Sequence, residues 1–303
     1  WIWHCLTGER MQGGKTGMKR KKVSAGDVVF YVVDHIVMFL VMLLCVYPFY
    51  YVFIYSISTP SAAQKGITFF PREFTLSNFA QVFRLAGIPN ALLISCMRTL
   101  IGTVITIMCC SLFAYLVTKE KMYGRKIIYR MVIVTMYFSS GLIPWYLTMK
   151  LYHLNNTFLV YVFPTAISAY YIVLLKTFIE QLPESLEESA KLDGAGYLQI
   201  FSKIVFPLSK PIIATITVFA AVAQWNNWFD NYILVSSDHL KTLQLMLYEY
   251  LNEASAIATM SNTERNQGIM VQITPEAVRM TITMVVTMPI LFIYPLMQKT
   301  FRK

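Results

Sequence analysis

The sequence has few charged residues for its length. Only 14% of its 303 residues are Asp, Glu, Lys or Arg, whereas soluble globular domains carry about 25%. Hydrophobic residues account for 56% of the chain, and the mean hydropathy is +0.52. This composition excludes an ordinary soluble domain and indicates a protein that lies largely within a membrane.

The sequence also lacks the patterns of catalytic and metal centres. Its four histidines are scattered, and its five cysteines have no metal-ligand spacing. Four of these cysteines lie in apolar runs, which is typical of buried unpaired thiols. The sequence contains no HExxH or GxSxG motif and no catalytic pair of carboxylates. We therefore expect no catalytic residue, no metal site and no enzyme activity in this chain.

One segment near the start of the chain resembles a nucleotide-binding loop but does not complete the motif. The segment Gly13-Gly14-Lys15-Thr16 resembles the end of a P-loop, but Glu9 occupies the position of the first glycine. A basic run follows this segment where the motif requires a helix. We expect the chain to bind no cofactor of its own, so the energy for any ATP-driven process would come from another subunit.

Long apolar segments are abundant. A membrane-spanning helix needs about 20 mostly apolar residues. Six segments meet this requirement, at 27–57, 91–118, 127–149, 155–179, 209–235 and 277–298. They lack the alternation of barrel strands, so the sequence predicts an all-α integral membrane protein with six transmembrane helices.

The net charge of +10 is concentrated in three basic clusters. These lie before the first segment, between the second and third, and at the end of the chain, at residues 15–22, 119–130 and 299–303. With six spans all three clusters fall on one side, which the positive-inside rule assigns to the cytoplasm. We therefore expect a multi-pass protein of the cell membrane, in contact with lipid, with both termini cytoplasmic and with no nucleic-acid partner.

The start of the chain is unusual because it begins with Trp1, and Met11 or Met18 is expected to be the native start. Residues 1–26 are predicted to be a cytoplasmic N-terminal segment, partly non-native or disordered. Residues 27–303 are predicted to form one transmembrane domain. The first apolar segment is too long for a signal peptide.

A polar stretch at 183–211, PESLEESAKLDGAGYLQIFSKIVFPLSKP, separates two apolar segments on the expected cytoplasmic side. Its early glutamates favour a helix N-terminus, and Leu182, Leu186 and Ala190 share one helical face. Gly194 and Gly196 predict a turn before a second short helix. These general features fit an ordinary amphipathic connector as well as a docking element.

The exact spacing within this stretch carries more information. Glu188-Ser189-Ala190, three residues, Gly194, nine residues and Ile204-Val205-Phe206-Pro207 resemble the EAA loop of bacterial ABC importer permeases, EAA-x3-G-x9-I-x-L-P. Ser189 and Phe206 depart from that pattern. Stretches at 141–164, 221–235 and 242–247 are similar to carbohydrate-importer permeases of the polysaccharide-uptake type. The resemblance implies a type I importer (MetI-like) permease fold and ATPase-coupling roles for Glu187, Glu188, Ser189, Ala190, Asp193, Gly194, Ala195, Ile204 and Pro207.

The same resemblance implies the function and the partners. The chain is expected to be the permease subunit of an importer that moves oligosaccharides across the cytoplasmic membrane. Its expected partners are a second, homologous permease in a heterodimer, two ATPase subunits that bind ATP and Mg²⁺, and an extracytoplasmic solute-binding protein. The alternative is a stand-alone secondary transporter that uses an ion gradient, with Asp230 as its ion or proton site.

Polar residues inside apolar segments are costly in lipid and therefore indicate function. The densest group lies in the fifth segment, and a sparser group lies in the third. Rings would stack on a sugar and amide or carboxylate groups would hydrogen-bond its hydroxyls, although packing between helices or anchoring at the interface would use the same residue types. The residues predicted for a substrate path are Trp225, Asn227, Trp228, Asp230, Tyr137 and Ser140.

Two stretches on the opposite side of the membrane carry shorter amphipathic patterns. Thr75 could cap a helix whose Phe79, Val82 and Phe83 face the bilayer surface, and a packed surface loop fits this stretch equally well. The second stretch, 242–254, predicts an interfacial helix.

Overall fold

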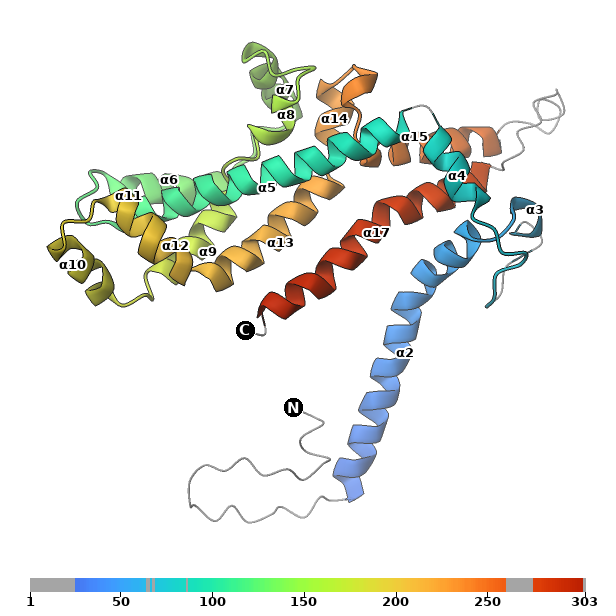
Figure 1. Ribbon diagram of the computed structural model, residues 1–303, viewed down its shortest axis with the longest axis horizontal. Helices are drawn as coiled ribbons and strands as arrows, with labels where there is room; N and C mark the ends of the chain where they lie inside the picture. The colour runs from blue at the N-terminus through green and yellow to red at the C-terminus, as the bar shows by residue number, and fades with distance from the viewer. Residues whose placement is uncertain (1–24, 64–65, 67–68, 86, 260–274, 302–303) are drawn as a thin grey trace. The chain divides into compact units, whose positions relative to one another are not determined.

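The computed structural model describes residues 25–63, 66, 69–85, 87–259 and 275–301 (Figure 1). Within these residues the regular elements are helices, and one isolated antiparallel bridge joins Ser58 to Phe74. The predicted all-α class is therefore confirmed. Residues 1–24 and 260–274 lie outside the described residues, and so do the expected start of the chain and most of its N-terminal segment.

The chain divides into two compact units, Trp1–Tyr50 and Tyr51–Lys303, which we describe separately. Helix α2, Ala25–Ser56, contains all the described residues of the first unit and continues into the second. Within Val29–Ser56, the most apolar 18 residues have a mean hydropathy of 2.5, and none of these residues is buried. This stretch is long and apolar enough to cross a membrane.

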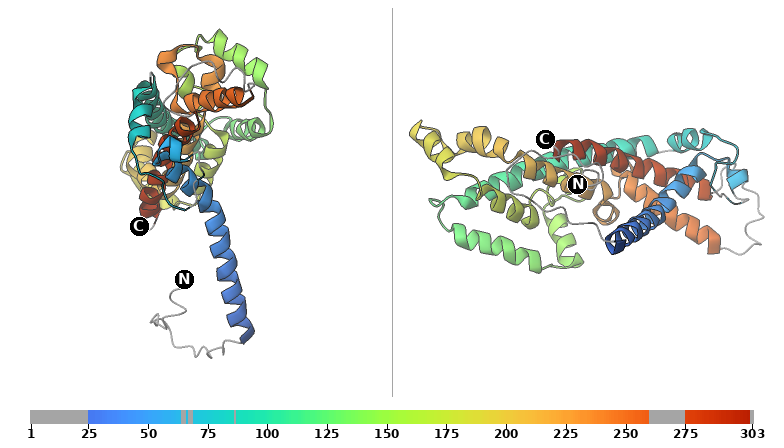
Figure 2. Two further views of the ribbon diagram at one scale, coloured as in Figure 1. Left: turned by 90° about the vertical axis from the view of Figure 1, so that its right-hand side faces the viewer. Right: turned by 90° about the horizontal axis from the view of Figure 1, so that it is seen from below.

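Helix α5, Ile88–Thr118, is the centre of the second unit (Figures 1 and 2). It has a mean hydropathy of 2.3. Helices α9, Ala169–Ile179, and α13, Lys210–Asn226, pack along it. Helix α17, Pro275–Phe301, packs against α13 and against α15, Leu243–Thr259. The α15 helix confirms the helix expected from residue 242 onward.

Three of the expected long helices are broken, so their prediction as continuous spans was wrong. The segment 127–149 forms α6, Arg125–Tyr137, and α7, Leu142–Leu151, because Gly141 between them has φ +79°. The segment 155–179 forms α8, Leu159–Val162, and α9, because a proline at 164 removes a backbone donor. The segment 209–235 forms α13 and α14, Phe229–Leu234.

Two described helices, α2 and α5, pass a length and hydropathy test for crossing a membrane. A third candidate is the pair Tyr197–Leu208 and Lys210–Asn226, which is bent by 82° at Ser209. These helices support a multi-pass membrane protein.

The short helices before α5 belong to the second unit and pack within it. Helices α3, Pro60–Ala63, and α4, Ser77–Arg84, precede α5 in the chain. Val82 is fully buried in a cluster with Ile88, and Phe79 packs beside Tyr55. The packed alternative therefore holds for Val82 and Phe79, whose expected orientation toward the bilayer surface was wrong, whereas Phe83 is 43% exposed.

The polar stretch from residue 183 folds as a helix, a turn and a second helical segment, as the sequence predicts. Helix α10 runs over Glu184–Leu192, and α11 over Tyr197–Ile200. A π-helical turn, Phe201–Val205, and α12, Phe206–Leu208, continue α11 to the bend before α13. We call residues 183–208 the polar loop.

Candidate functional site

The turn of the polar loop is a glycine-terminated helix cap. Gly194 has φ +79°, and its backbone amide donates to the carbonyl of Lys191 at 3.0 Å. The next amide, of Ala195, donates to the carbonyl of Ala190 at 2.9 Å. This pair of hydrogen bonds defines a Schellman motif, in which the residue after the cap adopts a left-handed conformation that favours glycine. The spacing from Ala190 to Gly194 is therefore set by the geometry of the cap.

The second half of the polar loop is anchored in a hydrophobic cluster with α5, α9 and α13. Ile200, Phe201 and Val205 are buried there. The Phe201 ring lies 5.4 Å from the Tyr115 ring, between centroids. Ile204 packs against the same cluster. The loop is thus attached to three helices at once, and a force on it would reach all three.

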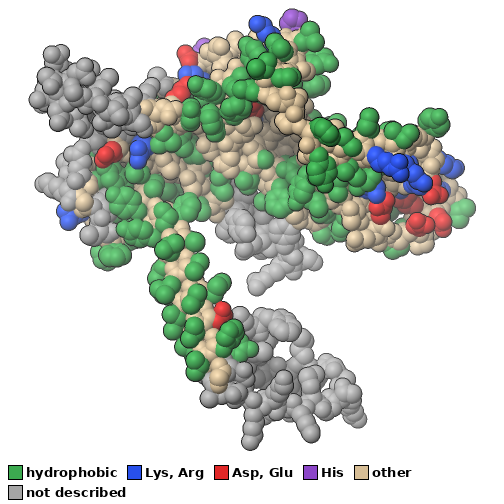
Figure 3. Space-filling model, turned by 180° about the vertical axis from the view of Figure 1, so that it is seen from behind, with side chains coloured by type: hydrophobic (Ala, Val, Ile, Leu, Met, Phe, Trp, Pro, Cys, Tyr) green, Lys and Arg blue, Asp and Glu red, His purple; other side chains and the backbone are tan. Residues whose placement is uncertain are grey.

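The first half of the polar loop presents an exposed surface. Among the described residues of α10 only Ala190 is buried. Leu192 and Leu198 are 90% and 68% exposed, beside the exposed Glu188 and Asp193. Figure 3 shows acidic and basic side chains gathered at the end of the molecule that carries α10. Exposed leucines framed by charges are suited to contact with another protein.

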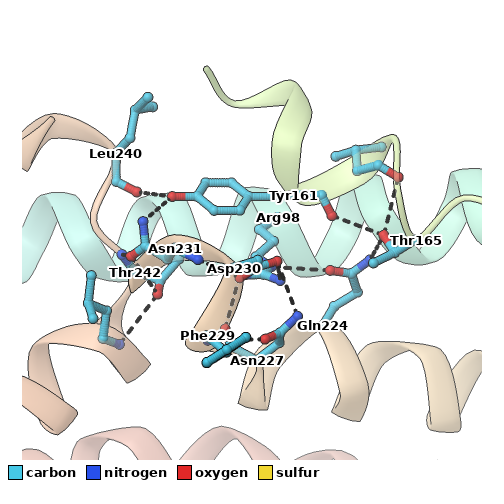
Figure 4. Close-up of polar contacts among 12 residues, drawn as sticks. Arg98, Tyr161, Thr165, Gln224, Asn227, Phe229, Asp230, Asn231, Leu240 and Thr242 are labelled. Atoms are coloured by element: carbon cyan, nitrogen blue, oxygen red, sulfur yellow. Dashed lines mark hydrogen bonds and ion pairs between the residues drawn. The ribbon is translucent and has the colours of Figure 1, made fainter. Parts of the chain in front are cut away.

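A second concentration of polar groups is buried between α5, α8, α13 and α14 (Figure 4). The guanidinium of Arg98 makes a two-pronged ion pair with the carboxylate of Asp230, with 3.0 Å from Nη1 to Oδ1. Arg98 also donates to the side-chain oxygen of Gln224 at 3.2 Å and to the carbonyl of Asn227 at 2.9 Å. A buried charge is tolerated when it is paired and hydrogen-bonded in this way.

The same network fixes α14 to its neighbours. The Arg98 guanidinium lies 4.6 Å from the centre of the Tyr161 ring. The Tyr161 hydroxyl donates to the carbonyl of Leu240 at 2.6 Å and accepts from the Asn231 amide. The Asn231 side-chain oxygen in turn accepts from the backbone amide of Thr242 at 2.9 Å. We use the name Arg98 network for these linked residues, which are Arg98, Tyr161, Gln224, Asn227, Asp230, Asn231, Leu240 and Thr242.

A hollow of about 260 Å³ opens beside the Arg98 network. Gln224 and Asn227 line it, and Gln224 donates to the Thr165 hydroxyl at 2.6 Å. Within the described part of the chain its lining contains no charged side chain. We call it the polar hollow, and it is lined by Thr106, Thr165, Ile167, Ser168, Tyr171, Ala220, Ala223, Gln224 and Asn227.

A glycine on α5 makes room for one wall of the polar hollow. A Cβ atom on Gly102 would approach the Gln224 side-chain nitrogen to 2.6 Å. That distance is far below van der Waals contact, so the Gln224 amide keeps its position only because residue 102 has no side chain. This position explains a glycine in the middle of a long helix, where it otherwise costs stability.

The residues predicted for a substrate path lie in different surroundings. Asn227 lines the polar hollow, whereas Asp230 is held in the Arg98 network. Trp225 is buried against α17, and its indole nitrogen donates to the carbonyl of Val286 at 3.0 Å. Trp228 stacks on Tyr248 with 4.0 Å between ring centroids. Because the helix breaks at Asn227, the two tryptophans do not share one continuous helical face.

The weaker predicted group lies on an exposed link. Tyr137 ends α6 and is 82% exposed, and Ser140 is exposed in the residues that lead to α7. Neither lines the polar hollow as described. Their assignment to the substrate path remains a prediction.

Several residues of these sites were missed from the sequence. Arg98 carried a usable signal, because a charge within an apolar segment needs a partner and Asp230 is the matching acid. Gln224 and Tyr161 carried none, since amide and hydroxyl side chains are common in packed helices. Lys119 was counted only as a member of a basic cluster.

The family described as "Binding-protein-dependent transport system inner membrane component" matches residues 107–301. Two proteins of Bacillus subtilis (strain 168) are similar over most of their length. Protein LplC is 34% identical over 84% of this chain and 86% of its own. The polygalacturonan/rhamnogalacturonan transport system permease protein YtcP is 35% identical over 86% of this chain and 91% of its own.

The fold is also found in a solved structure. A chain from the crystal structure of a bacterial ABC transporter involved in the import of the acidic polysaccharide alginate superposes with a TM-score of 0.84. It is 28% identical, and the match covers 93% of this chain and 99% of that one.

Proposed function

The chain belongs to the binding-protein-dependent transport system inner membrane component family, and on that basis we propose that it is the permease subunit of an ATP-driven importer of oligosaccharides. The observation that carries this proposal is the polar loop. Its first helix is exposed, its turn is capped at Gly194, and its second half is buried against α5, α9 and α13. That arrangement can receive motion from an ATPase and pass it to the membrane helices.

The proposed complex contains more than this chain. Two ATPase subunits bind ATP and Mg²⁺, and each docks on one polar loop. A second, homologous permease supplies the other loop and completes a heterodimer around the translocation path. An extracytoplasmic binding protein delivers the oligosaccharide. The incomplete P-loop at Gly13-Gly14-Lys15-Thr16 supports a separate source of ATP hydrolysis.

Six crossings of the membrane are part of the proposal. The broken helices α6 with α7, α8 with α9, and α13 with α14 each provide one crossing in two pieces. At the break between α13 and α14, Asn227 lines the polar hollow, and a backbone that leaves the helix at membrane depth is tolerated where it lines a cavity. This topology places the polar loop and both termini on the cytoplasmic side, together with the three basic clusters.

The polar hollow is the proposed contact for the sugar. Amides and hydroxyls without a charged group suit the hydroxyls of a sugar ring, and the Tyr171 ring at the edge provides an apolar face. The relatives named for polygalacturonan and alginate transport support an oligosaccharide as the substrate class. In this proposal Asn227 contacts the sugar, whereas Asp230 holds Asn227 in place through a 3.1 Å hydrogen bond.

A secondary transporter is the competing function. It would need an acid that can exchange a proton or an ion, and Asp230 was the candidate. The two carboxylate oxygens of Asp230 are occupied by Arg98, Asn227 and the backbone amide of Asn231. An acid held by this many donors favours a structural role over reversible ion binding.

Reconstitution into liposomes tests the proposed function. The chain is assembled with two ATPase subunits, a second permease and a binding protein. Uptake of labelled oligosaccharides from digests of polygalacturonan, alginate and a neutral glucan is then measured. We expect uptake of at least one of these to require ATP inside the liposomes and the binding protein outside. Uptake by this chain alone, driven by an ion gradient, would contradict the proposal.

The polar hollow gives a sharper prediction. Gly102→Ala should lower uptake severalfold, because its Cβ displaces the Gln224 amide from Thr165. The same change favours the helix itself by about 0.5–1 kcal/mol, so assembly should be preserved. Cys96→Ala, at an exposed position of α5, serves as the matched control and should transport normally. Normal uptake by Gly102→Ala would remove the polar hollow from the substrate path.

A further inference from the structure

The three glutamates of α10 differ in exposure. Glu184 and Glu188 are exposed, whereas Glu187 turns toward the end of α5. There Lys119, the first residue after α5, donates to both carboxylate oxygens of Glu187, with 2.6 Å to Oε2. The side chains of this pair are only 13% and 18% exposed. Glu187 is therefore bound within the chain, and only a small part of its side chain is exposed.

The ion pair rests on an aromatic ring that belongs to the membrane helix. The Lys119 ammonium lies 4.2 Å from the centre of the Tyr115 ring. Tyr115 is fully buried, and its ring lies beside the Phe201 ring in the second half of the polar loop. The Tyr115 side chain therefore contacts both this half of the loop and Lys119, the partner of Glu187 in the first half. Burial lowers the pKa of Lys119, and the hydrogen bond and charge of Glu187 act in the opposite direction. The pairing thus offsets part of the effect of burial on the pKa of Lys119.

Helix α10 has few other attachments among the described residues. Ala190 is its only buried residue, and it fixes the end of the helix that leads into the Gly194 turn. The Lys119–Glu187 pair is one turn earlier and holds the middle of the helix, since Glu187 is the fourth of its nine residues. A hollow of about 530 Å³ is lined by the pair itself, by Glu184, Glu188 and Lys191 of α10, and by residues of the link after α5. A helix attached at these two points transmits its displacement to the helices it contacts through both of them.

We propose that the Lys119–Glu187 ion pair, seated on Tyr115, is the joint that transmits movement of α10 to α5. The inference rests on the proposed function, because it needs an ATPase that moves α10. It assigns to Glu187 a positioning role inside the permease, and it leaves contact with the ATPase to the exposed residues Glu188, Leu192 and Asp193. Lys119 becomes a positioning residue for transport.

Charge reversal tests the joint in the fully reconstituted complex. Lys119→Glu and Glu187→Lys should each retain the ATPase subunits and basal ATP hydrolysis but lower uptake of the oligosaccharide that wild type transports by at least tenfold. The double variant, Lys119→Glu with Glu187→Lys, restores opposite charges and should recover uptake to within about threefold of wild type. Lys121→Glu, an exposed charge reversal in the same link, is the matched control and should transport within about twofold of wild type.

Three results would overturn the inference. These are normal uptake by the single variants, a double variant no better than either single one, and loss of the ATPase subunits from the single variants, which would make the pair a docking contact. Where a reversal does not assemble, Glu187→Gln removes the charge at nearly constant volume, and normal uptake by that variant would equally overturn it. Absence of ATP-dependent uptake by the wild-type complex would instead contradict the proposed function.

Discussion

Replacing Asp230 with alanine should destabilise the folded chain by about 3–5 kcal/mol, because it leaves the Arg98 guanidinium buried without its counter-charge. The loss is large because Arg98 is only 1% exposed. Asn227 and the backbone amide of Asn231 would also lose an acceptor. Thermal unfolding of the detergent-solubilised protein measures the effect, and we expect a marked fall in the yield of monodisperse protein.

The same substitution on the surface provides the control. Asp238 is exposed and pairs with Lys241 at 3.2 Å, and exposed pairs contribute about 0–1 kcal/mol. Asp238→Ala should therefore leave the unfolding temperature nearly unchanged. A variant with both Arg98→Met and Asp230→Leu should recover part of the lost stability, since neither charge is then buried alone. Wild-type stability of Asp230→Ala would show that the pair is not the support of α14.

Gly194→Leu should abolish the stimulation of ATP hydrolysis by the loaded binding protein while the complex still assembles. The left-handed conformation at φ +79° costs a residue with a side chain about 1–2 kcal/mol. That cost strains the turn but does not unfold the membrane helices. Nothing described lies within 4 Å of a Cβ at this position, so the space is open to the docked ATPase and the leucine would collide with it. ATP hydrolysis in proteoliposomes is the measurement.

Two further variants separate the turn from the contact. Gly194→Asn should retain most of the stimulation, because asparagine adopts the left-handed conformation more readily and is smaller. Residue 196 has an ordinary φ of −75°, so Gly196→Leu adds a bulky side chain two residues after the turn without straining the backbone. Full stimulation in Gly194→Leu would mean that the turn does not lie at the ATPase contact.

The two sites depend on the sequence in different ways. The Gly194 cap is built from six consecutive residues, so a glycine four places after Ala190 was a sufficient signal. The polar hollow joins α5, α9 and α13, whose residues are far apart in the chain. Polar side chains on a helix give no indication of which neighbour they face, and only Asn227 of its lining was predicted.

The helix breaks had a similar cause. Hydropathy measures how apolar a segment is, but not whether its backbone continues as one helix. At 227–228 the Asn227 side chain accepts from the backbone amide of Phe229 at 3.2 Å and donates to Asp230. Those hydrogen bonds take the place of the backbone hydrogen bonds that would continue the helix from α13 into α14. They depend on Arg98 of α5, which holds both Asn227 and Asp230 in position.

The membrane composition, the all-helical class and the polar loop with its capped turn could be predicted, because each of these follows from residues that are neighbours in the chain. The pairings of buried charges could not. Arg98 and Asp230 are 132 positions apart, and Lys119 and Glu187 are 68 apart. A charge in a helix specifies that a partner is needed but not which one, and only the tertiary fold, in which α13 packs along α5 and the polar loop is anchored to the same helices, brings these particular residues within bonding distance.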